Sequence, residues 1–233
     1  MRTAILTPES NQLAWDRVGD LAASGWDISE DDVRKIIKIL PLLFRKHLTD
    51  NGFDATKARA ISTKFRDAGR RSAPWSAFSK KVPGRPQDGG DGNRINRWLL
   101  PPDHKFYATE RDATLVEIKY YLQILSTTGA PVVESQKFTE NFTWLVGHEI
   151  APGSYLDPVK LTPVDFQEVI DDPRMITSGH IHPLDRGGKH EPTNTFLMLR
   201  DSNMLQGNNT ISELLQMIVG ILERHRTLRG FKG

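Results

Sequence analysis

The most informative segment of the chain runs from Met175 to Asn208 and reads MITSGHIHPLDRGGKHEPTNTFLMLRDSNMLQGN. Its first four residues are a short apolar and β-branched run that predicts a strand, and residues 195–199 (TFLML) predict a second one. Glycine, proline and aspartate are frequent in residues 179–193, which indicates a loop rich in turns. A short helix over residues 200–206, ended by Gly207, completes the order strand, loop, strand, helix.

Three polar residues stand at defined places in this order. His180 follows the first strand, Asn194 precedes the second strand fourteen residues later, and Asn203 lies on the helix nine residues further on. Together with the glycine-rich loop, this pattern resembles the signature of the HNH, or ββα-metal, endonucleases. The resemblance covers about residues 175–208 and implies a metal-dependent enzyme that hydrolyses phosphodiester bonds of DNA.

The resemblance gives each of the three residues a role, and the chemistry explains the residue types. Hydrolysis needs a group that takes a proton from water near neutral pH, and imidazole has the nearest unperturbed pKa. His180 is therefore the expected general base. Asn203 is expected to hold a divalent cation, Mg²⁺ or another such as Mn²⁺, through its amide oxygen. Asn194 is expected to hold the loop and to orient His180 through hydrogen bonds.

One departure from the family pattern concerns the metal. Many members have an aspartate before the catalytic histidine, where this chain has Gly179. A single Asn ligand with water in the other positions is adequate for magnesium, and His182 or Asp201 is an alternative second ligand. Strand alternation predicts that His182 lies on the same face as His180. For His190 we expect a solvated loop position rather than a phosphate contact.

The whole chain predicts a mostly helical α+β protein. Residues 1–71 form a predicted helical region and residues 72–109 a basic segment rich in Pro and Gly. Residues 110–170 form a second predicted helical region, and residues 171–233 contain the HNH ββα-metal motif and a C-terminal helix. At 233 residues, the chain is long enough for one substantial core plus a smaller unit.

Recognisable signals bound the individual helices. Ser29 is a predicted N-cap, and Pro41 is predicted to break the helix that follows and to start a new one. Residues 134–146 predict a single helix. Thr210 with Glu213 forms a predicted capping box for the last helix, whose apolar stripe is expected to face the core. The stripe comprises Ile211, Leu214, Leu215, Ile218, Ile221 and Leu222.

Charge is unevenly distributed along the chain. The net charge is only +2, yet residues 57–97 contain eleven Lys and Arg against three Asp. Such a stretch is typical of a surface on which a polyanion docks, and a solvated basic loop is the alternative. Two further arginines beside the motif are candidate phosphate clamps. The residues expected to contact DNA are thus Arg70, Arg71, Lys80, Lys81, Arg85, Arg186 and Arg200.

Composition limits the class of protein. Cysteine is absent, which excludes disulfides and cysteine-bound zinc. No apolar run approaches the ~20 residues that cross a bilayer, and the first residues lack the features of a secretory signal. We therefore expect a cytoplasmic protein with no membrane partner.

The layout of the chain narrows the predicted function. About 170 residues precede the compact motif, and no P-loop is present. The chain is in this respect most similar to a type II restriction endonuclease, which implies a site-specific cut in double-stranded DNA and a homodimer that matches a palindromic site. Two alternatives remain open. One is a non-specific or phage-defence HNH nuclease, and the other is a DNA-binding module whose HNH site is degenerate and inactive.

Overall fold

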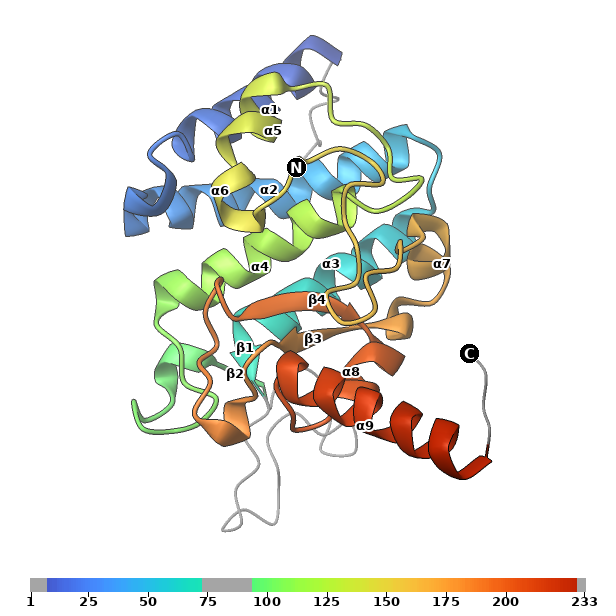
Figure 1. Ribbon diagram of the computed structural model, residues 1–233. Coiled ribbons are helices and arrows are strands. Elements are labelled where there is room, and N and C mark those ends of the chain that lie inside the picture. The colour runs from blue at the N-terminus through green and yellow to red at the C-terminus, as the bar shows by residue number, and fades with distance from the viewer. Residues whose placement is uncertain (1–7, 73–93, 230–233) are drawn as a thin grey trace.

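The computed structural model describes residues 8–72 and 94–229, which are mostly helical with two antiparallel two-stranded sheets (Figure 1). The predicted α+β class is confirmed for this part of the chain. The helices are α1 (Pro8–Leu21), α2 (Glu30–Asp50), α3 (Ala55–Gly69), α4 (Glu110–Leu125), α5 (Gln136–Asn141), α6 (Thr143–Val146), α7 (Phe166–Asp171), α8 (Arg200–Gln206) and α9 (Ile211–Arg229). The strands are β1 (Arg71–Ser72), β2 (Ile95–Asn96), β3 (Ile176–His180) and β4 (Thr195–Leu199).

The helix α4 lies at the centre of the molecule. Every residue from Ala113 to Leu125 is buried, because α2, α3, α6 and β4 all contact this helix (Figure 1). A single hydrophobic cluster runs from Trp15 in α1 to Leu197 in β4. The two helical regions and the strands of the C-terminal region therefore share one core.

Two buried polar side chains of α4 hold the C-terminal strands in place. The hydroxyl of Tyr120 donates to Oγ of Ser178 in β3 at 2.5 Å. Oε1 of Gln123 accepts the backbone N–H of Leu197 in β4 at 2.9 Å. Buried polar groups are costly unless they are hydrogen-bonded, so these contacts favour one position of the hairpin on α4.

The strand, loop, strand, helix order of residues 175–208 is confirmed. β3 pairs antiparallel with β4, with Ile176 opposite Leu199 and His180 opposite Thr195. α8 follows β4 directly and contacts both strands. This register leaves His180 at the end of β3, where the glycine-rich loop begins.

Two helix boundaries were predicted wrongly. α2 continues through Pro41 to Asp50, because Leu40 and Leu43 on both sides of the proline are buried in the core and this packing outweighs the missing N–H. Residues 134–146 form the two helices α5 and α6 rather than one. Phe142 leaves helical geometry between them, and its ring is fully buried in the core.

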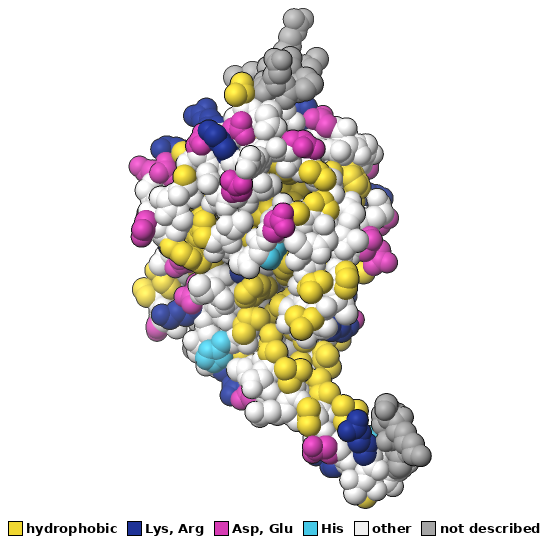
Figure 2. All heavy atoms as spheres, turned by 45° about the horizontal axis from the view of Figure 1, so that its top comes forward, with side chains coloured by type: hydrophobic (Ala, Val, Ile, Leu, Met, Phe, Trp, Pro, Cys, Tyr) yellow, Lys and Arg dark blue, Asp and Glu magenta, His cyan; other side chains and the backbone are white. Residues whose placement is uncertain are grey.

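The last helix departs from its predicted environment. Its capping box is present, because the Thr210 N–H donates to the Glu213 carboxylate at 2.9 Å and the Glu213 N–H donates back to Oγ1 of Thr210 at 3.3 Å. Only Leu214 of the predicted core-facing stripe is buried, and the side chains from Ile221 to Arg229 are all exposed. α9 projects from the body (Figure 1), and hydrophobic side chains lie along this limb (Figure 2). No helix among the described residues is long and apolar enough to span a membrane.

Candidate active site

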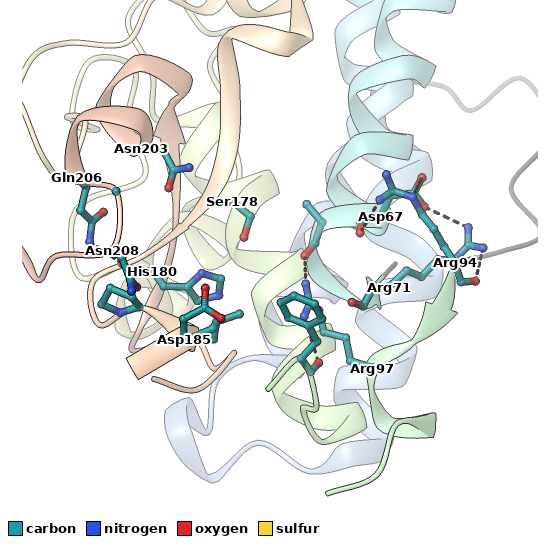
Figure 3. A pocket seen from close by; sticks show the side chains of 16 residues that line it. Asp67, Arg71, Arg94, Arg97, Ser178, His180, Asp185, Asn203, Gln206 and Asn208 are labelled. Carbon is teal, nitrogen blue, oxygen red and sulfur yellow. Dashed lines mark hydrogen bonds and ion pairs between the residues drawn. The ribbon is translucent and has the colours of Figure 1, made fainter. Parts of the chain in front are cut away.

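An open cavity of about 530 Å³ lies between the C-terminal motif and the end of α3. Two of the three predicted catalytic residues, His180 from β3 and Asn203 from α8, line one wall together with Ser178. Their side chains face the space in front of the opposite wall (Figure 3). That opposite wall includes Asp67, Arg71, Arg94 and Arg97.

Asn194 closes the loop that follows His180. Its Oδ1 accepts the His182 N–H at 2.7 Å, and its Nδ2 donates to the carbonyls of His182 (2.9 Å) and Lys189 (2.8 Å). The loop is so tight that a Cβ on Gly188 would lie 2.0 Å from the His182 carbonyl oxygen, which explains the glycine at this position. Asn194 thus holds the loop, while the His180 imidazole has a different partner.

The partner of the His180 imidazole is His190. Nε2 of His180 lies 3.1 Å from Nδ1 of His190, and Nε2 of His190 lies 2.8 Å from the carbonyl oxygen of Gly69 at the end of α3. His190 is only 1% exposed, so the solvated position predicted for it is wrong. The loop turns inward and packs this imidazole against α3.

Burial keeps both imidazoles neutral near pH 7. Burial, and after it the positive charge of Arg97, lowers the pKa of His180 to about 4. Burial and then the charges of Arg97 and His180 hold the pKa of His190 well below its ordinary value. At neutral pH, His180 therefore carries one unprotonated ring nitrogen, as a general base must.

Gly179 occupies the position where the family pattern has an aspartate. A Cβ on this residue would lie 2.0 Å from the sulfur of Met198, which covers this face of β3. Strand alternation directs a side chain at 179 away from the face that carries His180. A carboxylate here would have to displace the buried side chain of Met198 and would point away from His180.

α8 supplies two amide groups to the cavity. The Asn203 carboxamide has no hydrogen bond with any described residue, although it lines the cavity. Gln206, three residues later and also in the lining, is 1% exposed. Its Nε2 donates to the His180 carbonyl at 2.8 Å, whereas its Oε1 is buried and has no partner in the part of the chain that the structure describes. Amide oxygens suit a hard cation, so the residues present fit a divalent ion at this wall.

The two alternative ligands from the sequence lie elsewhere. β3 ends at His180, so strand alternation does not extend to His182, and the His182 side chain lines a separate depression formed by the loop. Asp201 forms an ion pair with Lys160. Within the described part of the chain, no three His, Cys, Asp or Glu side chains are grouped so that they could hold a metal ion. The two carboxylates that line the cavity, Asp67 and Asp185, form ion pairs with Arg71 and Lys105, so the amide oxygens are the candidate ligands without such a pair.

Arg97 is a cavity residue that sequence analysis did not single out. It is only 7% exposed and donates to the carbonyls of Ala68, Gly69 and Phe106. It has no ion pair with any described residue. Burial lowers its pKa to about 10, so the side chain remains a cation at neutral pH. The only sequence signal was its place in the basic segment, because its burial depends on how that segment packs against α3.

Of the seven predicted DNA contacts, Arg71 lines this cavity, three others are described but do not line it, and three lie outside the described residues. Arg186 is held by Glu213 at the start of α9, and Arg200 is exposed in the first turn of α8. Neither residue lines the cavity with His180. The predicted contacts outside the described residues are Lys80, Lys81 and Arg85.

Arg70 and Arg71 are adjacent in sequence but have different partners. Nε of Arg70 donates to the carboxylate of Glu117, which is 1% exposed. Burial raises the pKa of Glu117 to about 7, and the charge of Arg70 opposes this effect. Arg71 lines the cavity, donates to the Arg94 carbonyl at 2.8 Å and forms an ion pair with Asp67 at 3.2 Å. Both arginines thus have structural partners, and Arg71 is the one of the two that lines the cavity.

Single substitutions should separate these two roles. Arg70→Ala is expected to destabilise the fold by about 3 kcal/mol, because it leaves a buried carboxyl group without its partner. Arg71→Ala is expected to reduce the slope of log DNA affinity against log salt concentration by about one unit. Urea unfolding and a salt titration of DNA binding measure the two effects. An unchanged slope in the second variant would remove Arg71 from the DNA interface.

Comparisons with known proteins find matches among solved structures. No protein-family model matches the sequence, and no curated protein sequence matches it. Among solved structures, the chain is similar to one described as a type II restriction endonuclease, with 19% sequence identity and a TM-score of 0.45. The match covers 57% of this chain and 63% of that chain, which is less than two thirds of the restriction enzyme's length.

Proposed function

We propose that the protein is a metal-dependent endonuclease that hydrolyses phosphodiester bonds of double-stranded DNA at a ββα-metal (HNH) site. The observation that carries the proposal is the shared cavity, which is lined by the neutral imidazole of His180 and by the carboxamide of Asn203, which has no partner among the described residues. Arginines line the opposite wall. A phosphodiester in this cavity would meet a base, a candidate cation site and positive charge.

Each residue has a distinct part in this proposal. His180 accepts the proton of the water that attacks phosphorus, and Asn194 holds the loop that carries His180's hydrogen-bond partner. Asn203 would hold Mg²⁺ or Mn²⁺, with Oε1 of Gln206 as a second candidate ligand. When bound, such a cation neutralises charge on the phosphate and stabilises the departing oxygen. Arg97, a buried cation beside the base, is the candidate for binding a phosphate oxygen.

Digestion of plasmid DNA tests the proposed activity. The purified protein with Mg²⁺ should convert supercoiled plasmid to cut forms, and a chelator should prevent this. Discrete fragments from a long duplex would support a site-specific enzyme of the type II restriction kind, whereas a smear would support a non-specific nuclease. DNA binding without cleavage in both Mg²⁺ and Mn²⁺ would reject the enzyme and leave the inactive DNA-binding module.

We also propose that the enzyme is a homodimer that pairs through α9. Its apolar residues follow spacings of three and four, the pattern of helices that pack against one another. They are spread along about 28 Å of helix. No described element covers the C-terminal half of α9, where residues 221–229 are all exposed. A second copy would offer the same stripe, so the contact is self-complementary. The exposed apolar residues of α9 are Leu215, Met217, Val219, Ile221, Leu222 and Leu228.

Charge placed on this stripe should separate the subunits. The double substitution Ile221→Glu with Leu222→Glu is expected to convert a dimer to a monomer in analytical ultracentrifugation, and to leave the unfolding free energy within about 0.5 kcal/mol, because both side chains are exposed in one copy. Leu13→Glu, at an exposed leucine of α1, is the matched control and should remain dimeric. A wild-type protein that sediments as a monomer, or a double variant that stays dimeric, would refute the pairing.

A further inference from the structure

The contact between His180 and His190 determines where the protons lie on both rings. The carbonyl oxygen of Gly69 can only accept, so Nε2 of His190, 2.8 Å away, must carry a proton. A neutral imidazole has one N–H, and Nδ1 of His190 is then a bare acceptor. Since it lies 3.1 Å from Nε2 of His180, that nitrogen must donate. The remaining ring nitrogen, Nδ1 of His180, is left without a proton.

The far end of this chain of hydrogen bonds is firmly held. The Gly69 carbonyl also accepts from Nε of Arg97 at 2.9 Å. Gly69 itself packs so closely on α4 that a Cβ would lie 2.7 Å from Cβ of Glu117. His190 is almost completely buried between this carbonyl and His180. The hydrogen bonds from His180 to His190 and from His190 to Gly69 therefore connect the C-terminal motif to α3. His190 and Gly69 are 121 residues apart in sequence.

We propose that His190 is a positioning residue that keeps the proton of His180 on Nε2, so that Nδ1 stays free to accept a proton from the attacking water. The inference rests on the proposed function, in which His180 is the base. An imidazole in the wrong tautomer offers an N–H where a lone pair is needed, and orienting partners of this kind contribute strongly to catalysis. His190 acts only through His180 and does not line the cavity with it.

Two substitutions of His190 separate hydrogen bonding from bulk. His190→Leu fills similar space but neither accepts nor donates, whereas the carboxamide in His190→Gln can accept from His180 and donate to Gly69. We expect His190→Leu to lower the single-turnover cleavage rate by about 100-fold with unchanged DNA affinity, and His190→Gln to recover most of that rate. His47→Leu is the matched control, because His47 is also buried with a ring nitrogen on a backbone carbonyl, that of Pro131, far from this cavity in sequence.

The tautomer itself can be read without any activity. Long-range ¹H–¹⁵N NMR spectra of the free protein, assigned with His180→Ala, should show His180 protonated at Nε2 and bare at Nδ1. His190→Leu should give a mixture of tautomers, and His47→Leu should give the wild-type spectrum. If His190→Leu does not fold in thermal denaturation, the wild-type spectrum and His190→Gln still provide the test.

The outcomes distinguish this inference from the proposed function. A proton on Nδ1 of His180 in the wild type, or a folded His190→Leu that cleaves at the wild-type rate, would overturn the role of His190. If His180→Ala cleaves as well as the wild type, the proposed function fails. In that case the NMR spectra still decide whether His190 sets the tautomer.

Discussion

Replacing His180 by Ala should lower the rate of DNA cleavage by about 10²–10⁴-fold, which is the usual contribution of a positioned general base. The variant lacks the group that accepts the proton of the attacking water, while the cation site and the arginine wall are unchanged. DNA affinity should therefore be retained. Single-turnover cleavage at saturating DNA and Mg²⁺ measures the rate, and a gel-shift assay measures the affinity.

His182→Ala is the matched control for this variant. It removes an imidazole only two residues away that lines a separate depression, so its cleavage rate should be close to that of the wild type. The His180→Ala substitution removes the hydrogen-bond partner of the buried Nδ1 of His190, which should lower the free energy of unfolding by about 1–3 kcal/mol. Assays should be run well below the unfolding temperature of each variant. Equal rates for His180→Ala and the wild type would reject His180 as the base.

Asn203→Ala is the second substitution with a large expected effect. Loss of a residue that only orients a metal ligand typically lowers metal affinity or activity by about 10–100-fold. We therefore expect loss of the direct ligand to lower the cleavage rate by at least about 100-fold. The rate should recover in part at high Mg²⁺ concentration if the site is weakened rather than lost. Binding of Mn²⁺ followed by electron paramagnetic resonance should show the weaker affinity independently of activity.

Asn208→Ala provides the control for Asn203. It removes a side chain of the same type from the same cavity lining, just beyond α8. We expect this variant to bind Mn²⁺ and cleave DNA like the wild type. Unchanged Mn²⁺ affinity in Asn203→Ala would exclude that amide as a ligand, and Oε1 of Gln206 would then be the next residue to substitute.

Features that depend on neighbours in the chain were predicted correctly. The β3–β4 hairpin, α8, and the caps at Ser29 and Thr210 all follow from residues within a few positions of one another. The errors arose where distant packing competes with local preference. Pro41 lies within α2 because the helix is anchored by the core on both sides of it, and α9 is apolar along one face without a core to cover it.

The candidate site divides in the same way. The spacing of His180, Asn194 and Asn203 could be recognised in the sequence because one compact motif carries all three. The partner of the base could not, because His190 meets His180 only when the loop folds inward onto Gly69. The burial of Arg97 could not be predicted for the same reason. It depends on contacts with the end of α3, and the local sequence around Arg97 does not distinguish it from the other basic residues of the segment.

By itself, the amino-acid order of this chain determined a local motif, its glycines and the spacing of its polar residues, because short-range hydrogen bonds and backbone conformation depend on nearby residues. Only the tertiary structure decided which nitrogen of His180 is bare, which arginine lies beside it, and which predicted ligand stays outside the cavity. These properties depend on burial and on contacts between residues more than a hundred positions apart in sequence. They therefore cannot be predicted from a local sequence pattern.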